Sequence, residues 1–412
     1  MNAQRDGRIM DPGRLLESFF PRKLHDVALT HSDAVLRLNI TGYGSWGVTI
    51  SDGSAAVTRE APRKPTSTLT MGANTLEDVL LGRRSGVEAF LEGDLATRGS
   101  LATVLQVGGS LAPQAELPTR PKAWEVQASG ARTAYLEAGP ENAPPVVLLH
   151  GLGGTNATML PALAALAREY RVLAPDIPGF GASEAPLWNY TAARLYRWLD
   201  GFLRVTGTRG ATVVGNSMGG RLALELAMHD PVAARALVLL CPAPAFRRFR
   251  QLVPLVRYLP VSLGAAARLS VPRSLIVRSA KMMVAHPERM PESWFEAAAD
   301  EFALTMTHWR HRRAALSALA NIYIEEAFGA DGFWDRLRNV ATPALFVWGQ
   351  DDRLVPAKFA RHVEQALPRS ESVVLSDCGH APQLELPGKS MAITRDFLAS
   401  TAGLSARRCA VC

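Results

Sequence analysis

Cysteine is scarce in this chain, and long apolar runs are absent from it. The four cysteines (Cys241, Cys378, Cys409 and Cys412) are too few and too unevenly spaced among 412 residues for a disulfide framework, which favours a reducing interior. No apolar run reaches the ~18 residues of a transmembrane helix. The first residues also lack the apolar centre of a signal peptide. We therefore expect a cytoplasmic protein.

Positive charge is concentrated in one segment of the chain. The formal net charge is +7, and residues 242–313 carry twelve basic and five acidic side chains. Nucleic-acid binding is not expected, because these basic residues alternate with Leu, Val, Pro and Met instead of clustering with polar groups. Such interleaving favours peripheral contact with an anionic membrane, and a solvated charged surface is the alternative.

The stretch GNSMG at 215–219 lies between a short apolar run at 211–214 and a helical pattern at 220–227. A serine flanked by glycines at a strand-to-helix corner is typical of a nucleophile elbow, because the turn is too tight for side chains at the glycine positions. The hydroxyl of Ser217 would then lie above the strand ends, within reach of a base. An ordinary glycine-rich turn is the alternative, and the strand and helix on either side count against it.

Three further short apolar runs lead directly into polar segments that contain glycine. These segments are HGLGG at 150–154, GQDDRLVP at 349–356 and DCGH at 377–380. A serine, an aspartate and a histidine thus follow strands in the chain order of α/β-hydrolases, which differs from the chymotrypsin and subtilisin orders. The glycines of the first segment allow backbone N–H groups to turn inward as half of an oxyanion hole.

Residues from about 124 to 399 resemble the α/β-hydrolase superfamily, most closely its branch of esterases and C–C bond hydrolases. The motifs that carry the resemblance are HGLGG at 150–154, APDIPGFGAS at 174–183, GNSMGG at 215–220, WGQDDRLVP at 348–356 and GHAPQLELP at 379–387.

This resemblance implies a Ser-His-Asp triad that needs no cofactor and no metal. The nucleophile is Ser217 and the base is His380, while the family spacing W-G-x-x-D places the acid on Asp352 and not on its neighbour Asp351. The oxyanion would be met by the backbone N–H groups of two residues, Leu152 and Met218.

The pattern along the chain predicts an α/β-hydrolase fold, a mostly parallel sheet with helices on both faces and a helical lid, preceded by a small α+β domain. The predicted boundaries are 1–110 for the first domain, 111–122 for a proline-containing linker, 123–400 for the hydrolase domain with its lid at 241–328, and 401–412 for a disordered tail.

The first domain shows alternating segments at 34–40, 46–51, 55–60 and 66–71, followed by helical patterns. It resembles the SCP2 sterol-carrier domain on WGVTI at 46–50, DG at 52–53, TLTM at 68–71 and the glycines Gly82, Gly93 and Gly99. The resemblance implies an apolar tunnel for sterols, fatty acids or acyl chains. A packed domain without a cavity is the alternative.

The predicted function is hydrolysis of a hydrophobic carboxylic ester, with a small hydrophobic molecule or lipid as substrate. Three lid residues, Phe246, Met283 and Trp294, are predicted to line its pocket, although packing between lid and core is the commoner role of such residues. One alternative is a C–C bond hydrolase of a vinylogous diketone. GNSMGG favours it, but that family usually has Trp after the catalytic histidine, where this chain has Ala381. The other alternative is a lipid carrier or transfer protein, against which the complete triad counts.

Overall fold

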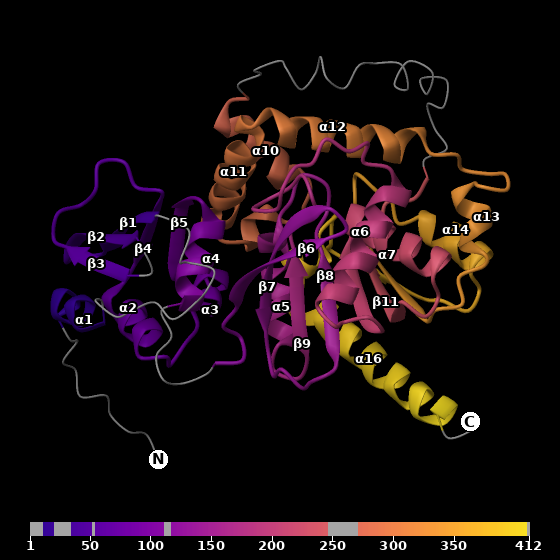
Figure 1. The fold of residues 1–412 in the computed structure, drawn as a ribbon, viewed down its shortest axis with the longest axis horizontal. Coiled ribbons are helices and arrows are strands. Elements are labelled where there is room, and N and C mark those ends of the chain that lie inside the picture. Colours follow the sequence, from indigo (N-terminus) through magenta and orange to yellow (C-terminus); the bar gives the residue numbers. More distant parts are fainter. Residues whose placement is uncertain (1–10, 20–33, 52–53, 111–116, 246–270, 410–412) are drawn as a thin grey trace.

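In the computed structural model the described residues form two β-sheets, which belong to two domains that lie side by side (Figure 1). It describes the whole chain apart from residues 1–10, 20–33, 52–53, 111–116, 246–270 and 410–412. Among the described residues, no helix combines the length and the apolar character needed to cross a membrane.

The first domain is a five-stranded sheet in the order β3-β2-β1-β4-β5 with helices packed against it. β1 pairs in parallel with β4, and the other neighbours are antiparallel. Every second residue of β1 is buried, as expected for a strand with one face on the core. The strands are β1 (Ala34–Ile40), β2 (Gly44–Ser51), β3 (Ser54–Thr58), β4 (Ser67–Met71) and β5 (Leu95–Gly99). The helices are α1 (Pro12–Phe19), α2 (Ala73–Leu80), α3 (Gly86–Leu91) and α4 (Leu101–Ser110).

Strand β5 was not predicted from the sequence, although the other four strands were. Its sequence, LATRG, has one large apolar residue and ends in glycine, so it lacks the alternation of apolar and polar side chains that indicates a strand. The strand ends at Gly99, whose φ is +88° and where an added Cβ would lie 2.5 Å from the carbonyl oxygen of Thr66. Only glycine fits this position without backbone movement.

The hydrolase domain is an eight-stranded sheet in the order β13-β12-β11-β10-β8-β9-β7-β6. From β13 to β9 all neighbours are parallel, and the pairs β7–β9 and β6–β7 are antiparallel. All residues of β10 and β12 are buried, as expected for strands covered on both faces. The strands are β6 (Lys122–Ala128), β7 (Ala131–Ala138), β8 (Pro145–Leu149), β9 (Arg171–Pro175), β10 (Ala211–Asn216), β11 (Ala234–Leu240), β12 (Ala344–Gly349) and β13 (Glu371–Leu375).

Helices cover both faces of this large sheet, because successive side chains of each strand point to opposite sides. Leu148 packs with α5 and α16 in one core, whereas its neighbour Leu149 packs with α6, α7, α13 and α14 in the other. The first of these cores continues into the first domain. The helices are α5 (Leu160–Leu166), α6 (Ala192–Val205), α7 (Met218–His229), α13 (Phe333–Leu337), α14 (Phe359–Ala366), α15 (Pro382–Glu385) and α16 (Pro387–Cys409), with a 3-10 turn, η2 (Asn156–Met159), before α5.

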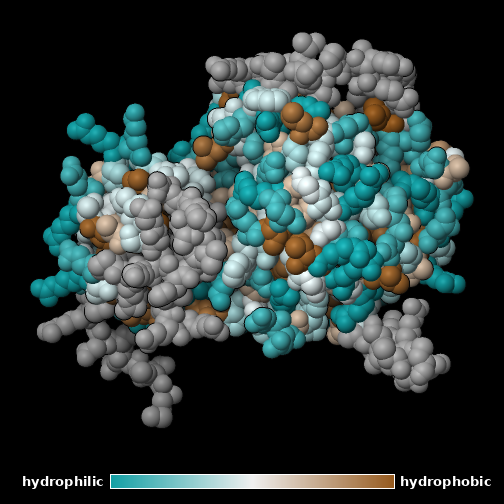
Figure 2. Space-filling view, viewed as in Figure 1, coloured by the Kyte–Doolittle hydropathy of each residue, from teal (hydrophilic) through white to brown (hydrophobic). Residues whose placement is uncertain are grey.

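In the described part of the segment between β11 and β12, three longer helices lie above the sheet: α10 (Arg273–Met282), α11 (Glu292–Thr307) and α12 (Trp309–Ile324), with the turn η4 (Pro287–Arg289) after α10 (Figure 1). They fall within the predicted lid. Figure 2 shows apolar side chains at the surface of this part of the molecule. The exposed apolar residues on α10 and α12 are Leu275, Met282, Trp309, Leu316 and Leu319.

Helix α11 also fastens the first domain to the hydrolase domain. Asp300 accepts hydrogen bonds from Arg98 Nε at 2.7 Å and from the Gly99 N–H at 2.9 Å. The next residue, Glu301, is buried and accepts the N–H of Leu101, the first residue of α4, at 3.0 Å. A carboxylate at a helix N-terminus satisfies an N–H that has no partner within the helix. The two domains are therefore joined by directed hydrogen bonds.

The structure adds detail to one predicted segment and differs from the prediction at another. Leu117, Arg120 and Pro121, from the second half of the predicted linker, line a cavity of the first domain, so this part of the chain is packed. The predicted disordered tail continues instead as the backbone of α16 as far as Cys409. Five of the nine residues at 401–409 are Ala, Leu or Arg, which are strong helix formers, and they favour continuation of the helix despite Gly403. Residues 111–116 and 410–412 lie outside the described part.

Glu301→Ala is expected to loosen the junction between the domains. The substitution leaves the buried Leu101 N–H without its acceptor, which costs about 1–3 kcal/mol. Thermal unfolding should show this loss, and hydrogen exchange at the start of α4 should accelerate. Glu364→Ala, at an exposed position of α14, is the control and should stay within about 0.5 kcal/mol of the parent protein. Equal effects of the two substitutions would show that the Glu301 contact does not hold the domains together.

Candidate active site

Ser217 lies at the corner between β10 and α7, in the geometry expected of a nucleophile elbow. Its φ is +52° and its ψ is −112°, a conformation that a residue with a side chain rarely adopts and that costs of order 1–3 kcal/mol. An added Cβ on Gly215 would lie 2.4 Å from the backbone of Gly219, and one on Gly219 would lie 2.4 Å from the carbonyl oxygen of Leu149. The glycines of the motif are therefore required by close backbone contacts.

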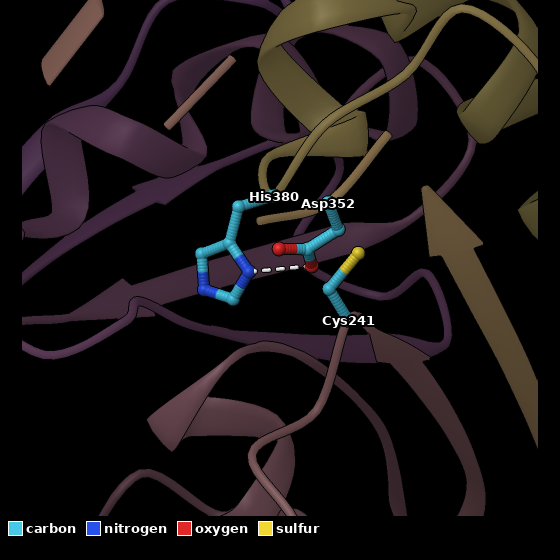
Figure 3. A group of neighbouring side chains, drawn as sticks. All are labelled: Cys241, Asp352 and His380. Carbon is cyan, nitrogen blue, oxygen red and sulfur yellow. Dashed lines mark hydrogen bonds and ion pairs between the residues drawn. The ribbon is translucent and has the colours of Figure 1, made fainter. Parts of the chain in front are cut away.

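The side chain of His380 is hydrogen-bonded to Asp352 and not to Asp351 (Figure 3). The distance between His380 Nδ1 and Asp352 Oδ2 is 2.7 Å, and both residues are buried. The other carboxylate oxygen of Asp352 accepts the N–H groups of Leu354 and Val355 at 2.8 and 2.9 Å. Asp351 is exposed. Because Nδ1 is bonded to the carboxylate, Nε2 is the imidazole nitrogen left to act on a substrate or a serine.

The loop that carries His380 is held by two residues that the sequence analysis did not single out. Asn216 Nδ2 donates to the carbonyl oxygens of His380 and Leu240, both at 3.0 Å, which ties the residue before Ser217 to the histidine loop. Glu385 accepts the N–H groups of Gly379 and Ala381 on either side of His380, at 2.7 and 3.0 Å. Both residues lie within motifs that carry the family resemblance, GNSMGG and GHAPQLELP, at positions to which no role was given.

The HGLGG turn lies directly against the elbow. An added Cβ on Gly151 would lie 3.3 Å from Ser217 Cβ. His150 anchors the turn, since its Nε2 accepts the Ile177 N–H at 2.9 Å and its Nδ1 donates to the Gly151 carbonyl oxygen at 2.8 Å. Burial lowers the pKa of His150 to about 4, so the ring stays neutral near pH 7. Met218 begins α7, which places its N–H at a helix N-terminus.

A cavity of about 420 Å³ lies beside the HGLGG turn and beneath α10 and α11. Its wall includes Asn216 and Ala381, the chain neighbours of Ser217 and His380. Met283 and Trp294, which were predicted as substrate-binding residues, also line it, and their contact with substrate stays a prediction. Phe246, the third predicted pocket residue, lies outside the described residues.

Cys241 lies beside the histidine–aspartate pair (Figure 3). Its Sγ and ligand atoms of Asp352 and His380 all lie within 4.8 Å of one another, which makes these residues a potential three-ligand metal site. Burial raises the pKa of the Cys241 thiol well above its usual range, and the nearby Asp352 charge adds to the effect. His380 Nδ1 and Asp352 Oδ2 already share a hydrogen bond of 2.7 Å, which a metal ion between them would have to replace.

Comparison with known proteins assigns both domains to families. Residues 144–387 match the family described as alpha/beta hydrolase fold, and residues 15–112 match the SCP-2 sterol transfer family. The chain belongs to the α/β-hydrolase fold family. It is therefore a hydrolase by fold, with an SCP2 domain at its N-terminal end.

Individual relatives agree with this assignment. The chain is 30% identical over 288 residues to 2-hydroxy-6-oxo-6-(2'-aminophenyl)hexa-2,4-dienoic acid hydrolase of Metapseudomonas resinovorans, covering 68% of this chain and 92% of that one. A solved enol-lactonase from Burkholderia xenovorans shares 24% identity over 67% of this chain and 100% of its own, with a TM-score of 0.56. A bacterial membrane phospholipase A shares 23% identity over 73% of this chain and 90% of its own, with a TM-score of 0.58. The two solved structures support the fold.

Asp352→Asn is expected to reduce ester hydrolysis by about 10⁴-fold, because the amide cannot hold His380 in the tautomer that accepts a proton at Nε2. Asp351→Asn is the matched control and should keep activity within a few-fold, since Asp351 is exposed and the carboxylate bonded to His380 Nδ1 is that of Asp352. Initial rates on a soluble ester at pH 7 measure both. An inactive Asp351→Asn protein beside an active Asp352→Asn protein would show that the acid is misassigned.

Proposed function

We propose that the protein hydrolyses esters of hydrophobic carboxylic acids through an acyl-enzyme on Ser217. The observation that carries the proposal is the apolar cavity beside the elbow, with the HGLGG turn in its wall. Its volume of about 420 Å³ falls within the ~300–1,000 Å³ of ligand pockets. Burial of each CH₂ group contributes ~0.8 kcal/mol, so a wall of Leu, Met, Trp and Phe side chains favours an acyl chain.

In the proposed mechanism, His380 Nε2 accepts the proton of the Ser217 hydroxyl as the oxygen attacks the acyl carbon. Asp352 holds the ring through Nδ1 and stabilises the imidazolium. The N–H groups of Leu152 and Met218 donate to the tetrahedral oxyanion, and loss of one such donor typically costs ~3 kcal/mol. His380 then gives its proton to the leaving alcohol. It next activates a water that releases the acid and restores the serine.

A second candidate is hydrolysis of a C–C bond in a vinylogous diketone. The relative from Metapseudomonas resinovorans favours it, because that protein is named for such a dienoic acid substrate. A dienoic acid carries a carboxylate, which a pocket normally matches with a cation. Among the described residues that line the cavity, the one charged side chain is Glu301, an acid. Ala381 also follows His380 where C–C hydrolases usually have Trp. Both observations favour a neutral ester.

A role as lipid carrier alone is the third candidate. The first domain contains a separate apolar cavity of about 120 Å³ between its sheet and helices. Cavities of ~150 Å³ hold a molecule the size of benzene, so this space is too small for a whole sterol or fatty acid. This size counts against a role as carrier of a whole lipid. Two further points stay proposals: that this domain binds a hydrophobic ligand, and that the protein contacts an anionic membrane.

The described charges bear on that membrane contact. Five of the twelve basic residues in 242–313 fall in 246–270, outside the described part. Arg273 is paired with Glu296 and Asp300, and Lys281 is paired with Glu292. These ion pairs reduce the positive charge that α10 presents. Because part of the positive charge is neutralised in this way, an assay with a soluble ester is a more direct test of the proposed hydrolysis than an assay of membrane binding.

The rate on p-nitrophenyl esters is expected to rise from acetate to octanoate. Each added CH₂ buried in the cavity should raise kcat/KM by up to about fourfold, the equivalent of ~0.8 kcal/mol. Ser217→Ala is the control and should remove the activity on every ester in the series. A preference for acetate, or cleavage of a vinylogous diketone much faster than any ester, would contradict the proposal.

A further inference from the structure

The cavity of the first domain and the cavity beside the elbow share part of their walls. Phe90, on α3, and Leu101, at the start of α4, line both of them. Both residues are buried, with exposed fractions of 8% and 5%. The barrier between the cavities thus includes two apolar side chains, and both belong to the first domain.

The hydrolase domain holds this barrier from the other side. Trp294 of α11 stacks on Phe90 with ring centroids 6.2 Å apart and planes inclined by 16°. Its Nε1–H donates to the Phe90 carbonyl oxygen at 2.9 Å. The contact between Glu301 and the Leu101 N–H fixes the other half of the barrier. These two hydrogen bonds hold the backbone at Phe90 and Leu101. The barrier would therefore open through rotamer changes of the Phe90 and Leu101 side chains.

The walls of the two cavities are mainly apolar on both sides of the barrier. The first-domain cavity is lined mainly by apolar side chains, among them Leu36, Leu38, Val48, Leu69, Leu76 and Val79. The elbow cavity continues this lining with Leu91, Trp294, Phe295 and Phe302. An acyl chain that crossed from one cavity to the other would pass the apolar side chains of Phe90 and Leu101. Glu301, the charged residue in the described wall of the elbow cavity, already accepts the Leu101 N–H as its hydrogen-bond partner.

We propose that the first-domain cavity is the subsite for the distal end of a long acyl chain whose ester carbon lies at Ser217. Phe90 and Leu101 form the gate through which the chain passes. The inference rests on the proposed ester hydrolysis and extends it, because it makes the SCP2 domain part of the substrate site. Short acyl chains would be held by the elbow cavity alone, whereas long chains would need both cavities.

Val79→Phe tests the subsite in the full-length protein. Val79 is half-buried on α2 and lines the first-domain cavity without lining the elbow cavity, so a larger side chain would fill only the former. The ratio of kcat/KM on p-nitrophenyl palmitate to that on the butyrate should fall by about tenfold or more, the equivalent of at least two excluded CH₂ groups. Val57→Phe is the matched control, because Val57 is a half-buried valine of β3 that lines neither cavity. It should leave the ratio unchanged.

A second readout uses the unmodified protein and covers the case in which Val79→Phe does not fold. A fluorophosphonate with a long alkyl chain and a terminal diazirine would label Ser217 and, on irradiation, cross-link the far end of its chain. Peptides from α2 or β4 should carry the cross-link. Cross-links confined to α10 and α11 would overturn the inference, as would equal palmitate-to-butyrate ratios in folded Val79→Phe and Val57→Phe proteins. In both cases the proposed function would stand. An unmodified protein that hydrolyses no ester would overturn the proposed function itself, and the inference with it.

Discussion

The close backbone contact between the elbow and the neighbouring strand is the constraint on which the site depends. Gly219 lies so near the end of β8 that an added Cβ would be 2.4 Å from the carbonyl oxygen of Leu149. At this contact α7 begins directly after β10, with Ser217 at the corner in its unusual conformation. The same strand end leads into the HGLGG turn. One packing contact thus brings the serine and the expected oxyanion donors to the same edge of the sheet.

A second constraint is the docking of α11 on the first domain. Its hydrogen bonds join residues about 200 positions apart in the sequence, and they place α3 and α4 in the wall of the elbow cavity. In consequence, the SCP2 domain contributes side chains to the space in which the proposed chemistry occurs. A chain that only tethered two independent modules would not need buried hydrogen bonds at their junction.

The sequence predicts the fold and the residues of the candidate triad, but it does not predict the contacts between the two domains. The order of Ser217, Asp352 and His380 follows from their places after apolar runs, whereas the choice of Asp352 over Asp351 rests on the resemblance to the α/β-hydrolase family. The observed hydrogen bond between Asp352 and His380 agrees with that choice. Their catalytic roles stay predictions. Glu301 and the shared wall at Phe90 could not be predicted, because they arise from contacts between distant segments that leave no local periodicity. The continuation of α16 to Cys409 was not predicted, because a frayed end was expected there. The helix propensity of the segment outweighs that expectation.

The central claim is that a hydrophobic acyl group becomes covalently attached to Ser217 during turnover. The most direct measurement is intact-protein mass spectrometry of the enzyme quenched in acid within the first turnovers of a long-chain p-nitrophenyl ester. The account predicts an added mass equal to that acyl group, located on the peptide that contains Ser217 and absent from the Ser217→Ala protein. Rapid hydrolysis with the acyl group attached to another residue would contradict it.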